Sequence, residues 1–281
     1  MREPTARRAG DAPLVRRTLI GAGVLLTLLF LVAPVAVVFV QALAAGFGPY
    51  LQNLAAPDTL HAIWLTVLTV LVVLPVNLLF GLAAAWAITR FSFRGKSFLV
   101  TLIELPFSIS PIVAGVIYLF LYGAQGLLGP WLQQYDLRIM FSVPAIILVS
   151  LFVTSPFVAR ELIAFMQTQS SEDEEAARSL GASGWQMFMR VTLPNIRWAL
   201  LYGAILCTAR TIGEFGAVSV VSGNIRGQTN TLPLQIELLY NDYNAAGAFA
   251  AASVLALIGL LTILVKALVE EFGPRERNEQ S

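Results

Sequence analysis

Long stretches without a charged residue alternate along this chain with short polar connections. The first runs from Leu19 to Ala45, 27 residues without Asp, Glu, Lys or Arg. About 20 apolar residues let a helix cross the roughly 30 Å hydrocarbon core of a bilayer. Apolar residues make up 57% of the 281 positions and charged residues only 12%, about half of the charged share in soluble domains. The sequence therefore predicts a polytopic membrane protein.

Six largely apolar segments are predicted to be transmembrane helices. None has the alternating pattern of a barrel strand, and a helix satisfies its own backbone hydrogen bonds in lipid. The first segment also exceeds the roughly 7–15 apolar residues of a signal peptide. We therefore expect an all-α fold with spans at Leu19–Ala45, Ile63–Ile88, Phe98–Tyr122, Met140–Ala159, Trp198–Ser222 and Ala245–Val269.

The positive charges predict the orientation of the chain. Membrane proteins keep Lys and Arg mainly in short cytoplasmic segments. Fifteen of the 18 Lys and Arg residues lie near the chain ends, in the turn after the second span or in the connection after the fourth. Arg138 and Arg226 fall on the other side, and Arg210 lies inside the fifth span. Both termini are therefore expected in the cytoplasm, in tails covering residues 1–18 and 271–281, and residues 19–58 would hold the first span and an external loop.

Several kinds of catalytic or ligand site are disfavoured. The single cysteine, Cys207, excludes an internal disulfide and a cysteine-based metal site. Gly95-Lys96-Ser97 resembles the end of a phosphate-binding loop, but Arg90 stands where that loop needs its first Gly. An intramembrane enzyme would need a site built around the lone His61, which is better interpreted as a helix-end residue. We therefore expect no catalytic residue, no metal, no ATPase site and no nucleic-acid partner.

The cytoplasmic loop 167–197, within the connection between the fourth and fifth spans, has the pattern of two short helices. Ser171 and Glu174 have the spacing of a capping box, in a cluster of acids that suits the start of a helix. Gly181 can adopt the left-handed conformation that ends a helix, and Ser183 can begin the next one.

The second of these helices carries a large apolar surface, formed by Trp185, Met187, Phe188 and Met189. One alternative is a helix lying on the membrane surface. However, the neighbouring acids would be repelled by anionic lipid. A docking element for a soluble protein is the preferred interpretation.

The same loop resembles the EAA signature of ABC importer permeases. That pattern is Glu-Ala-Ala-x3-Gly-x9-Ile-x-Leu-Pro, and the chain has Glu175-Ala176-Ala177, Gly181 and Val191-Thr192-Leu193-Pro194 at this spacing, with Val191 in place of Ile. The likeness covers about residues 59–270 and is greatest to the W-type subunit of the sulfate/thiosulfate permeases. Supporting segments are Glu104–Pro111, Ile212–Gly223 and Arg226–Leu234.

This resemblance implies a type-1 ABC importer permease fold in the cytoplasmic (inner) membrane of a bacterium, surrounded by lipid. It implies a homologous permease subunit as partner, two copies of an ATP-binding subunit that hydrolyse the ATP, and a periplasmic or external sulfate/thiosulfate-binding protein. The chain itself would bind no cofactor. The residues expected to couple the loop to the ATPase are Glu175, Ala176, Ala177, Gly181, Trp185, Phe188, Leu193 and Pro194.

Two sets of residues are candidates for the translocation path. Arg210 and Glu214 are four residues apart in the fifth span and are expected on one helix face. Each charge inside a membrane costs about 2.5–3.5 kcal/mol, so mutual pairing would explain both, as a structural ion pair or as part of the path. Ser108 and Ser110 lie between Pro106 and Pro111, which should break the third span toward a pathway or simply shape the packing.

The polar segment between the last two spans is expected to be external. Arg226, Gln228, Thr229 and Asn230 would face the binding protein or belong to a solvated loop, and a short helix should begin at Thr231 or Pro233.

Two alternative functions remain. One is a permease for molybdate or a related oxyanion. The other is an ion-coupled secondary transporter, which the EAA loop and the lack of a second related half disfavour.

Overall fold

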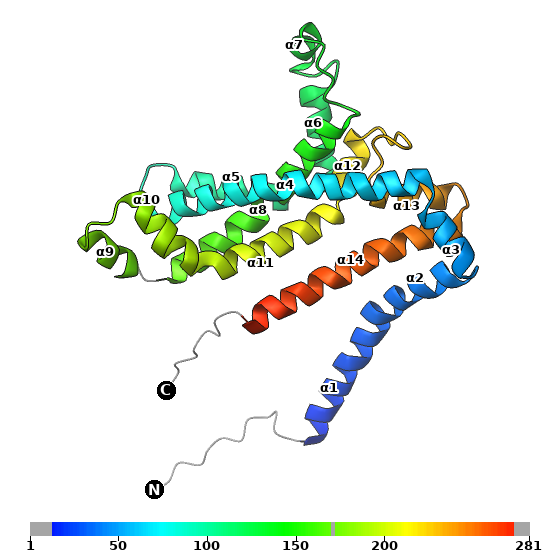
Figure 1. Ribbon diagram of the computed structural model, residues 1–281, viewed down its shortest axis with the longest axis horizontal. Helices are drawn as coiled ribbons and strands as arrows, with labels where there is room; N and C mark the ends of the chain where they lie inside the picture. The colour runs from blue at the N-terminus through cyan, green and yellow to red at the C-terminus, as the bar shows by residue number, and fades with distance from the viewer. Residues whose placement is uncertain (1–12, 170–171, 273–281) are drawn as a thin grey trace.

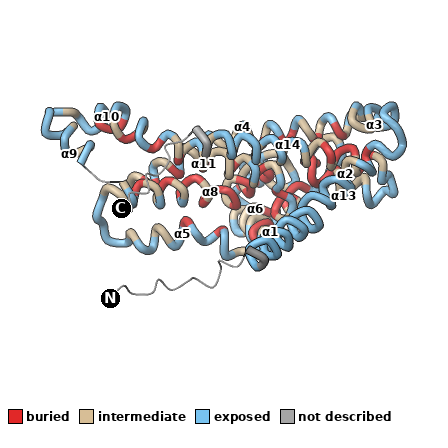
Figure 2. Tube along the Cα trace, turned by 90° about the horizontal axis from the view of Figure 1, so that it is seen from below, coloured by how far each residue is buried: buried red, intermediate tan, exposed pale blue. Residues whose placement is uncertain are grey.

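The computed structural model describes residues 13–169 and 172–272, and these ranges contain helices but no strands (Figure 1). Four long helices form the bundle at the centre of the molecule. Its buried side chains line the contacts between these helices, whereas the outward faces are exposed and largely apolar, as lipid contact requires (Figure 2). The bundle helices are α4 (Pro57–Arg90), α8 (Val143–Thr168), α11 (Leu193–Ile212) and α14 (Ala245–Phe272).

Small residues let α4, α8 and α11 approach one another closely around Val158. A Cβ atom added to Gly81 of α4 would lie 2.8 Å from Val158 Cβ and 2.9 Å from the Ala159 backbone nitrogen. A Cβ atom on Gly203 of α11 would lie 3.2 Å from Val158 Cα. Without a hydrophobic driving force between helices in lipid, such close backbone packing is a main source of stability.

Four helices in the described ranges are long and apolar enough to cross a membrane. They correspond to the first, second, fourth and sixth predicted spans, and the exact number of spans stays a prediction. The fourth helix continues nine residues past the predicted end at Ala159, so Arg160 and Glu161 lie inside it and not in the following loop. The four are Val15–Leu43, Pro57–Arg90, Val143–Thr168 and Ala245–Val269.

The third predicted span is broken in two. Helix α5 (Lys96–Ser108) and helix α6 (Pro111–Tyr122) are bent by 108° relative to each other. The break lies just before Pro111, because a proline disfavours the helical conformation of the preceding residue, and Ser110 has ψ 136°. Together the two helices are long and apolar enough to cross a membrane, as one bent span or a re-entrant segment.

The fifth predicted span is not a continuous helix, contrary to expectation. Helix α11 ends at Ile212, and a separate helix, α12 (Gly216–Val221), follows after a short break. Gly213 and Gly216 flank the break, and glycine is a poor helix former. Neither α11 nor α12 qualifies as a span by itself.

The amino-terminal segment extends away from the bundle (Figure 1). It is one rod made of α1 (Pro13–Thr27), the π-helical turn η1 (Leu28–Val32) and α2 (Ala33–Leu43). Its α2 end packs against α14. The predicted external loop then contains a short helix, α3 (Phe47–Leu54), which Tyr50 ties to α14 through a 3.1 Å hydrogen bond with Ser253.

The two ends of the bundle carry different structures. Helices α13 (Leu232–Asn241) and α3 lie at the end that we call the far end, whereas α6 and α7 (Gly129–Gln134) project sideways from the middle of the bundle, where α6 packs against α12 (Figure 1). Helix α13 begins after Thr231, as predicted, and its Leu232 N–H donates to Thr66 Oγ1 of α4 over 2.8 Å.

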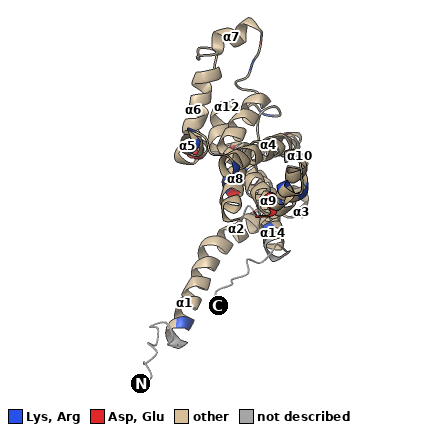
Figure 3. Ribbon diagram, turned by 90° about the vertical axis from the view of Figure 1, so that its left-hand side faces the viewer, with Lys and Arg blue, Asp and Glu red and all other residues tan. Residues whose placement is uncertain are grey.

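The opposite end, the loop end, carries the predicted pair of short helices. They are α9 (Glu172–Ser179) and α10 (Gly184–Met187), followed by the π-helical turn η2 (Phe188–Thr192). Charged residues gather here, whereas α6 and α12 are uncharged (Figure 3).

Candidate functional site

Local sequence signals build the two-helix loop as expected. Gly181 has φ +84°, the left-handed conformation that follows the end of α9. Ser183 begins α10 with a complete capping box: its side chain accepts from the Gln186 N–H over 3.3 Å, and Gln186 Oε1 accepts from the Ser183 N–H over 2.9 Å. The other predicted capping box would begin at Ser171, which lies outside the described residues.

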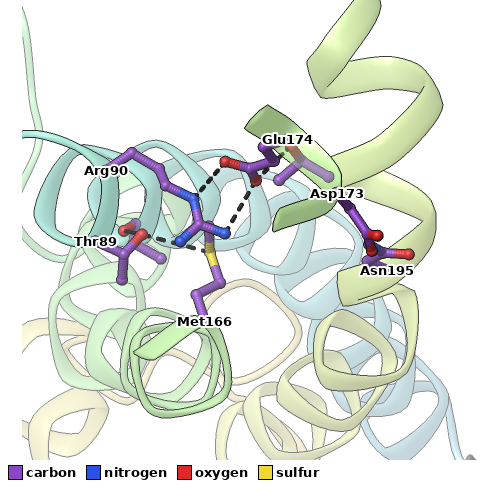
Figure 4. Close-up of polar contacts among 8 residues, drawn as sticks. Thr89, Arg90, Met166, Asp173, Glu174 and Asn195 are labelled. Carbon is purple, nitrogen blue, oxygen red and sulfur yellow. Dashed lines mark hydrogen bonds and ion pairs between the residues drawn. The ribbon is translucent and has the colours of Figure 1, made fainter. Parts of the chain in front are cut away.

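Glu174 connects the loop to the bundle (Figure 4). Its carboxylate forms an ion pair with Arg90 at the end of α4, 2.8 Å from Nε, and accepts a hydrogen bond from Arg90 Nη2 over 2.9 Å. Thr192 Oγ1 donates to the same carboxylate over 2.9 Å. The side chains of Arg90 and Glu174 are only 16% and 12% exposed, so the pair is well shielded from water.

This contact was not predicted, because Glu174 was assigned to a helix cap and its partner lies 84 residues earlier in the chain. A shielded, two-point contact between guanidinium and carboxylate fixes the direction as well as the distance of the interaction. The neighbouring Asp173 makes a weaker, exposed contact, accepting from Asn195 Nδ2 over 3.3 Å (Figure 4).

The apolar side chains of the second loop helix divide between two environments. Phe188 is buried and stacks on Trp86 of α4, with ring centroids 4.4 Å apart and an interplanar angle of 12°. The expectation that Phe188 belongs to an exposed docking surface is therefore wrong. Met187 is buried too. The exposed apolar surface of the loop consists of Leu180, 89% exposed, Trp185, 66% exposed, and Met189.

The remaining motif residues line the loop and the start of α11. Glu175 and Ala176 are exposed on α9, and Ala177 is half-buried. Leu193 is half-buried and Pro194 is exposed in the first turn of α11. The structure thus presents Glu175, Ala176, Trp185 and Pro194 to a partner, and the coupling role of all these residues stays a prediction.

Arg210 and Glu214 form the expected ion pair, but not on one helix. Arg210 Nη1 lies 2.7 Å from Glu214 Oε2. Glu214 lies beyond the end of α11, in the break before α12, which corrects the prediction that both share a helix face. Its Oε1 accepts from the Ala217 N–H over 3.0 Å, so this buried carboxylate also caps the start of α12.

Ser108 and Ser110 lie at the 108° bend between α5 and α6, and both are exposed. Ser110 makes no side-chain cap on α6. The sharp bend agrees with the prediction that Pro106 and Pro111 interrupt this segment, and whether the serines line a pathway stays a prediction.

The segment at the far end contains both exposed and buried candidates. Arg226 pairs with Asp242, and Gln228 is exposed. Thr229 and Asn230 are buried: Thr229 Oγ1 accepts from the Ile225 N–H, and Asn230 Nδ2 donates to Gln235 Oε1. Their side chains stabilise the loop internally and are not available to face an external protein, contrary to expectation.

Comparison with known proteins decides what kind of chain carries this loop. Residues 77–277 match the family described as binding-protein-dependent transport system inner membrane component. The chain belongs to this family. It is therefore a membrane transport subunit and not an enzyme, as the sequence motif indicated.

Named relatives of this family member belong to sulfate transport systems. The sulfate transport system permease protein CysW of Escherichia coli K12 is 58% identical over 252 residues, covering 90% of this chain and 87% of that protein. Sulfate permease 2, chloroplastic, of Chlamydomonas reinhardtii is 47% identical over 262 residues, covering 93% and 71%. The CysT permease protein of E. coli K12 is 33% identical over 257 residues, covering 91% and 93%. The resemblance to sulfate permeases is confirmed.

Solved structures confirm the ABC importer permease fold. A chain of a bacterial ABC transporter that imports the acidic polysaccharide alginate superposes with a TM-score of 0.77 at 17% identity, covering 92% of this chain and 96% of that one. A second structure, the alginate transporter in complex with its pentasaccharide-bound periplasmic protein, gives 0.75 at 19% identity, covering 93% and 94%.

Proposed function

We propose that this chain is a permease subunit of an ATP-driven importer for sulfate and thiosulfate. The observation that carries the proposal is the 58% identity to a sulfate permease protein across 90% of the chain. The two-helix loop supports it, because a chain without a phosphate-binding loop must receive the energy of ATP hydrolysis through contact with another protein.

The loop supplies such a contact surface. Leu180, which follows the charged helix α9, and Trp185 of α10 are exposed apolar side chains at the loop end. Large, rigid aromatic side chains of this kind typically anchor protein interfaces. In the proposed assembly this end faces the cytoplasm and contacts one of two ATPase subunits, and both chain termini lie on the same side.

The far end supports contact with an external binding protein. Arg226 and Gln228 are its exposed polar candidates, in a segment held by the buried Thr229 and Asn230. The alginate transporter crystallised with its periplasmic protein has the same permease fold. The partner permease in the membrane would be a homologue of the CysT type, which is also related to this chain.

Growth on defined sulfur sources tests the substrate. A bacterial strain that lacks its sulfate permeases should grow on sulfate or thiosulfate once this chain and its homologous partner are supplied with the ATPase and the binding protein. Rescue of a molybdate-uptake mutant in place of the sulfate-uptake mutant would assign the chain to a different oxyanion.

A further inference from the structure

One face of α4 holds both halves of the loop. Trp86 and Arg90 are four residues apart in α4 and therefore lie on the same face. The Trp86 ring stacks on Phe188, directly after α10. The Arg90 guanidinium binds Glu174 of α9 at two points. The last turns of α4 are thus a common contact surface for both parts of the loop.

Glu174 links this contact surface to another bundle helix. The carboxylate that binds Arg90 also accepts the hydrogen bond from Thr192, which is buried at the end of η2, one residue before α11 begins. Hydrogen bonds to an ionised group are shorter and stronger than those between neutral groups. A movement of α9 will therefore act on α4 and on the start of α11 together.

The loop does not fill the space beside the last turns of α4. A cavity of about 320 Å³ lies between α4 and the loop, and its walls include Trp86, Arg90, Glu174 and Met187. Close-packed protein interiors have few voids larger than a water molecule and transmit strain. Beside this space, the ion pair and the Trp86–Phe188 stack are the contacts that join the loop to α4.

We propose that Arg90 and Glu174 are positioning residues that convert movement of the loop into movement of α4 and α11. This inference rests on the proposed function, in which an ATPase moves the loop. Loss of the pair should let the loop move without its helices, so that ATP is hydrolysed with less sulfate transported.

The first test measures sulfate uptake and ATP hydrolysis together, in vesicles containing the complete complex with its binding protein. Glu174→Gln should lower the sulfate transported per ATP at least about fivefold, the lower range of typical coupling between sites. Asp173→Asn is the matched control, since Asp173 is the preceding acid on the same helix and its contact with Asn195 is exposed. It should leave the ratio unchanged.

Charge reversal separates positioning from a general structural role. Arg90→Glu alone should lower the sulfate transported per ATP, and Arg90→Glu combined with Glu174→Arg should restore much of it. The proposal would be overturned if Glu174→Gln left the sulfate transported per ATP unchanged, or if Asp173→Asn lowered it equally. It would also be overturned if the complex with the reversed pair assembled but transported as poorly as the single variants.

A second readout does not depend on the substrate. A spin label on a Ser179→Cys variant, at the exposed end of α9, should become more mobile in the assembled complex when Glu174 is replaced by Gln, and not when Asp173 is replaced by Asn. Equal mobility in all three chains would contradict the proposal. A wild-type complex that takes up no sulfate would instead overturn the proposed function, while the label still reports on the Arg90–Glu174 contact.

Discussion

Glu214 shows how a single carboxylate is kept inside a largely apolar chain. It is only 2% exposed, and an ionised group can be buried at acceptable cost only when it is paired and hydrogen-bonded. Arg210 supplies the opposite charge and the Ala217 N–H supplies a hydrogen bond. The break between α11 and α12 therefore holds a pair whose two members depend on each other.

Removing the cation should destabilise the chain more than removing both charges. Arg210→Ala leaves the carboxylate without its counter-ion and is expected to lower the free energy of unfolding by about 3 kcal/mol. Adding Glu214→Gln should recover part of this loss, because a neutral amide needs no counter-ion and its oxygen can still accept from Ala217. Unfolding of the purified chain in detergent measures both effects.

The same variants separate the two roles considered for the pair. Additive stability losses would contradict the energetic coupling between Arg210 and Glu214. Loss of sulfate uptake in variants of unchanged stability would assign the pair to the translocation path.

At the scale of the helix, glycine is required at two positions for different physical reasons. Gly181 needs a left-handed backbone at the end of α9, although nothing lies within 4 Å of where its Cβ would be. Gly81 has an ordinary helical backbone, but α8 lies directly against it. The first requirement is conformational and local, and the second is steric and depends on the fold.

Gly181→Val should impair uptake while the protein remains in the membrane. A residue with a Cβ costs roughly 1–2 kcal/mol in the left-handed conformation, so the turn between α9 and α10 should shift or open. Gly184→Ala is the control, since Gly184 also has free space for a Cβ and no positive φ. Normal uptake by Gly181→Val would contradict a role for the loop geometry.

Gly81→Ala should lower stability by about 1–3 kcal/mol, because the added methyl group overpacks the contact with Val158 and the Ala159 backbone. Gly259→Ala, in α14, has nothing within 4 Å and should be neutral or slightly stabilising. Thermal unfolding of the two variants side by side checks the prediction. Equal thermal unfolding midpoints for the two variants would contradict the close packing of α4 against α8.

At the scale of the whole molecule, the bundle separates two functional ends. Helix α4 extends between them, binding Glu174 through Arg90 at the loop end and α13 through Thr66 at the far end. Helices α6 and α12 contain no charged residue. In the proposed assembly the loop end would face the ATPase and the far end would face the binding protein.

Two exposed tryptophans allow a direct test of where the ATPase binds. Trp185→Ala should reduce retention of the ATPase subunit on the purified permease pair at least about fivefold, because truncating a buried aromatic anchor typically costs more than 1 kcal/mol of binding energy. Trp131→Ala, which replaces an exposed tryptophan on the projecting helix α7, should not affect retention. Unchanged retention with Trp185→Ala would place the ATPase contact elsewhere.

Much of the fold was predictable from local signals in the sequence. The charge-free runs predicted the long helices, and Gly181 and Ser183 predicted the limits of α9 and α10, because these signals act over a few residues. The EAA pattern predicted the family. What failed depends on contacts that these patterns do not report: Phe188 is buried against Trp86 of α4, and the side chains of Thr229 and Asn230 pair with Ile225 in the same loop and with Gln235 in α13.

The ends of charged helices were also beyond local prediction. Arg160 was placed in a loop because it follows the last apolar run, yet α8 continues through it to Thr168. Hydropathy reports where lipid is favourable, whereas a helix continues as long as its backbone bonds are satisfied and its neighbours pack. For the same reason the sequence did not show that Glu214 would lie outside α11.

ATP-dependent accumulation of labelled sulfate in vesicles is the most direct measurement of the central claim. Vesicles holding the permease pair and ATPase, with ATP on the ATPase side and the binding protein on the other, should accumulate sulfate, and omission of ATP or of the binding protein should abolish accumulation. Uptake driven by an ion gradient without ATP would contradict the account.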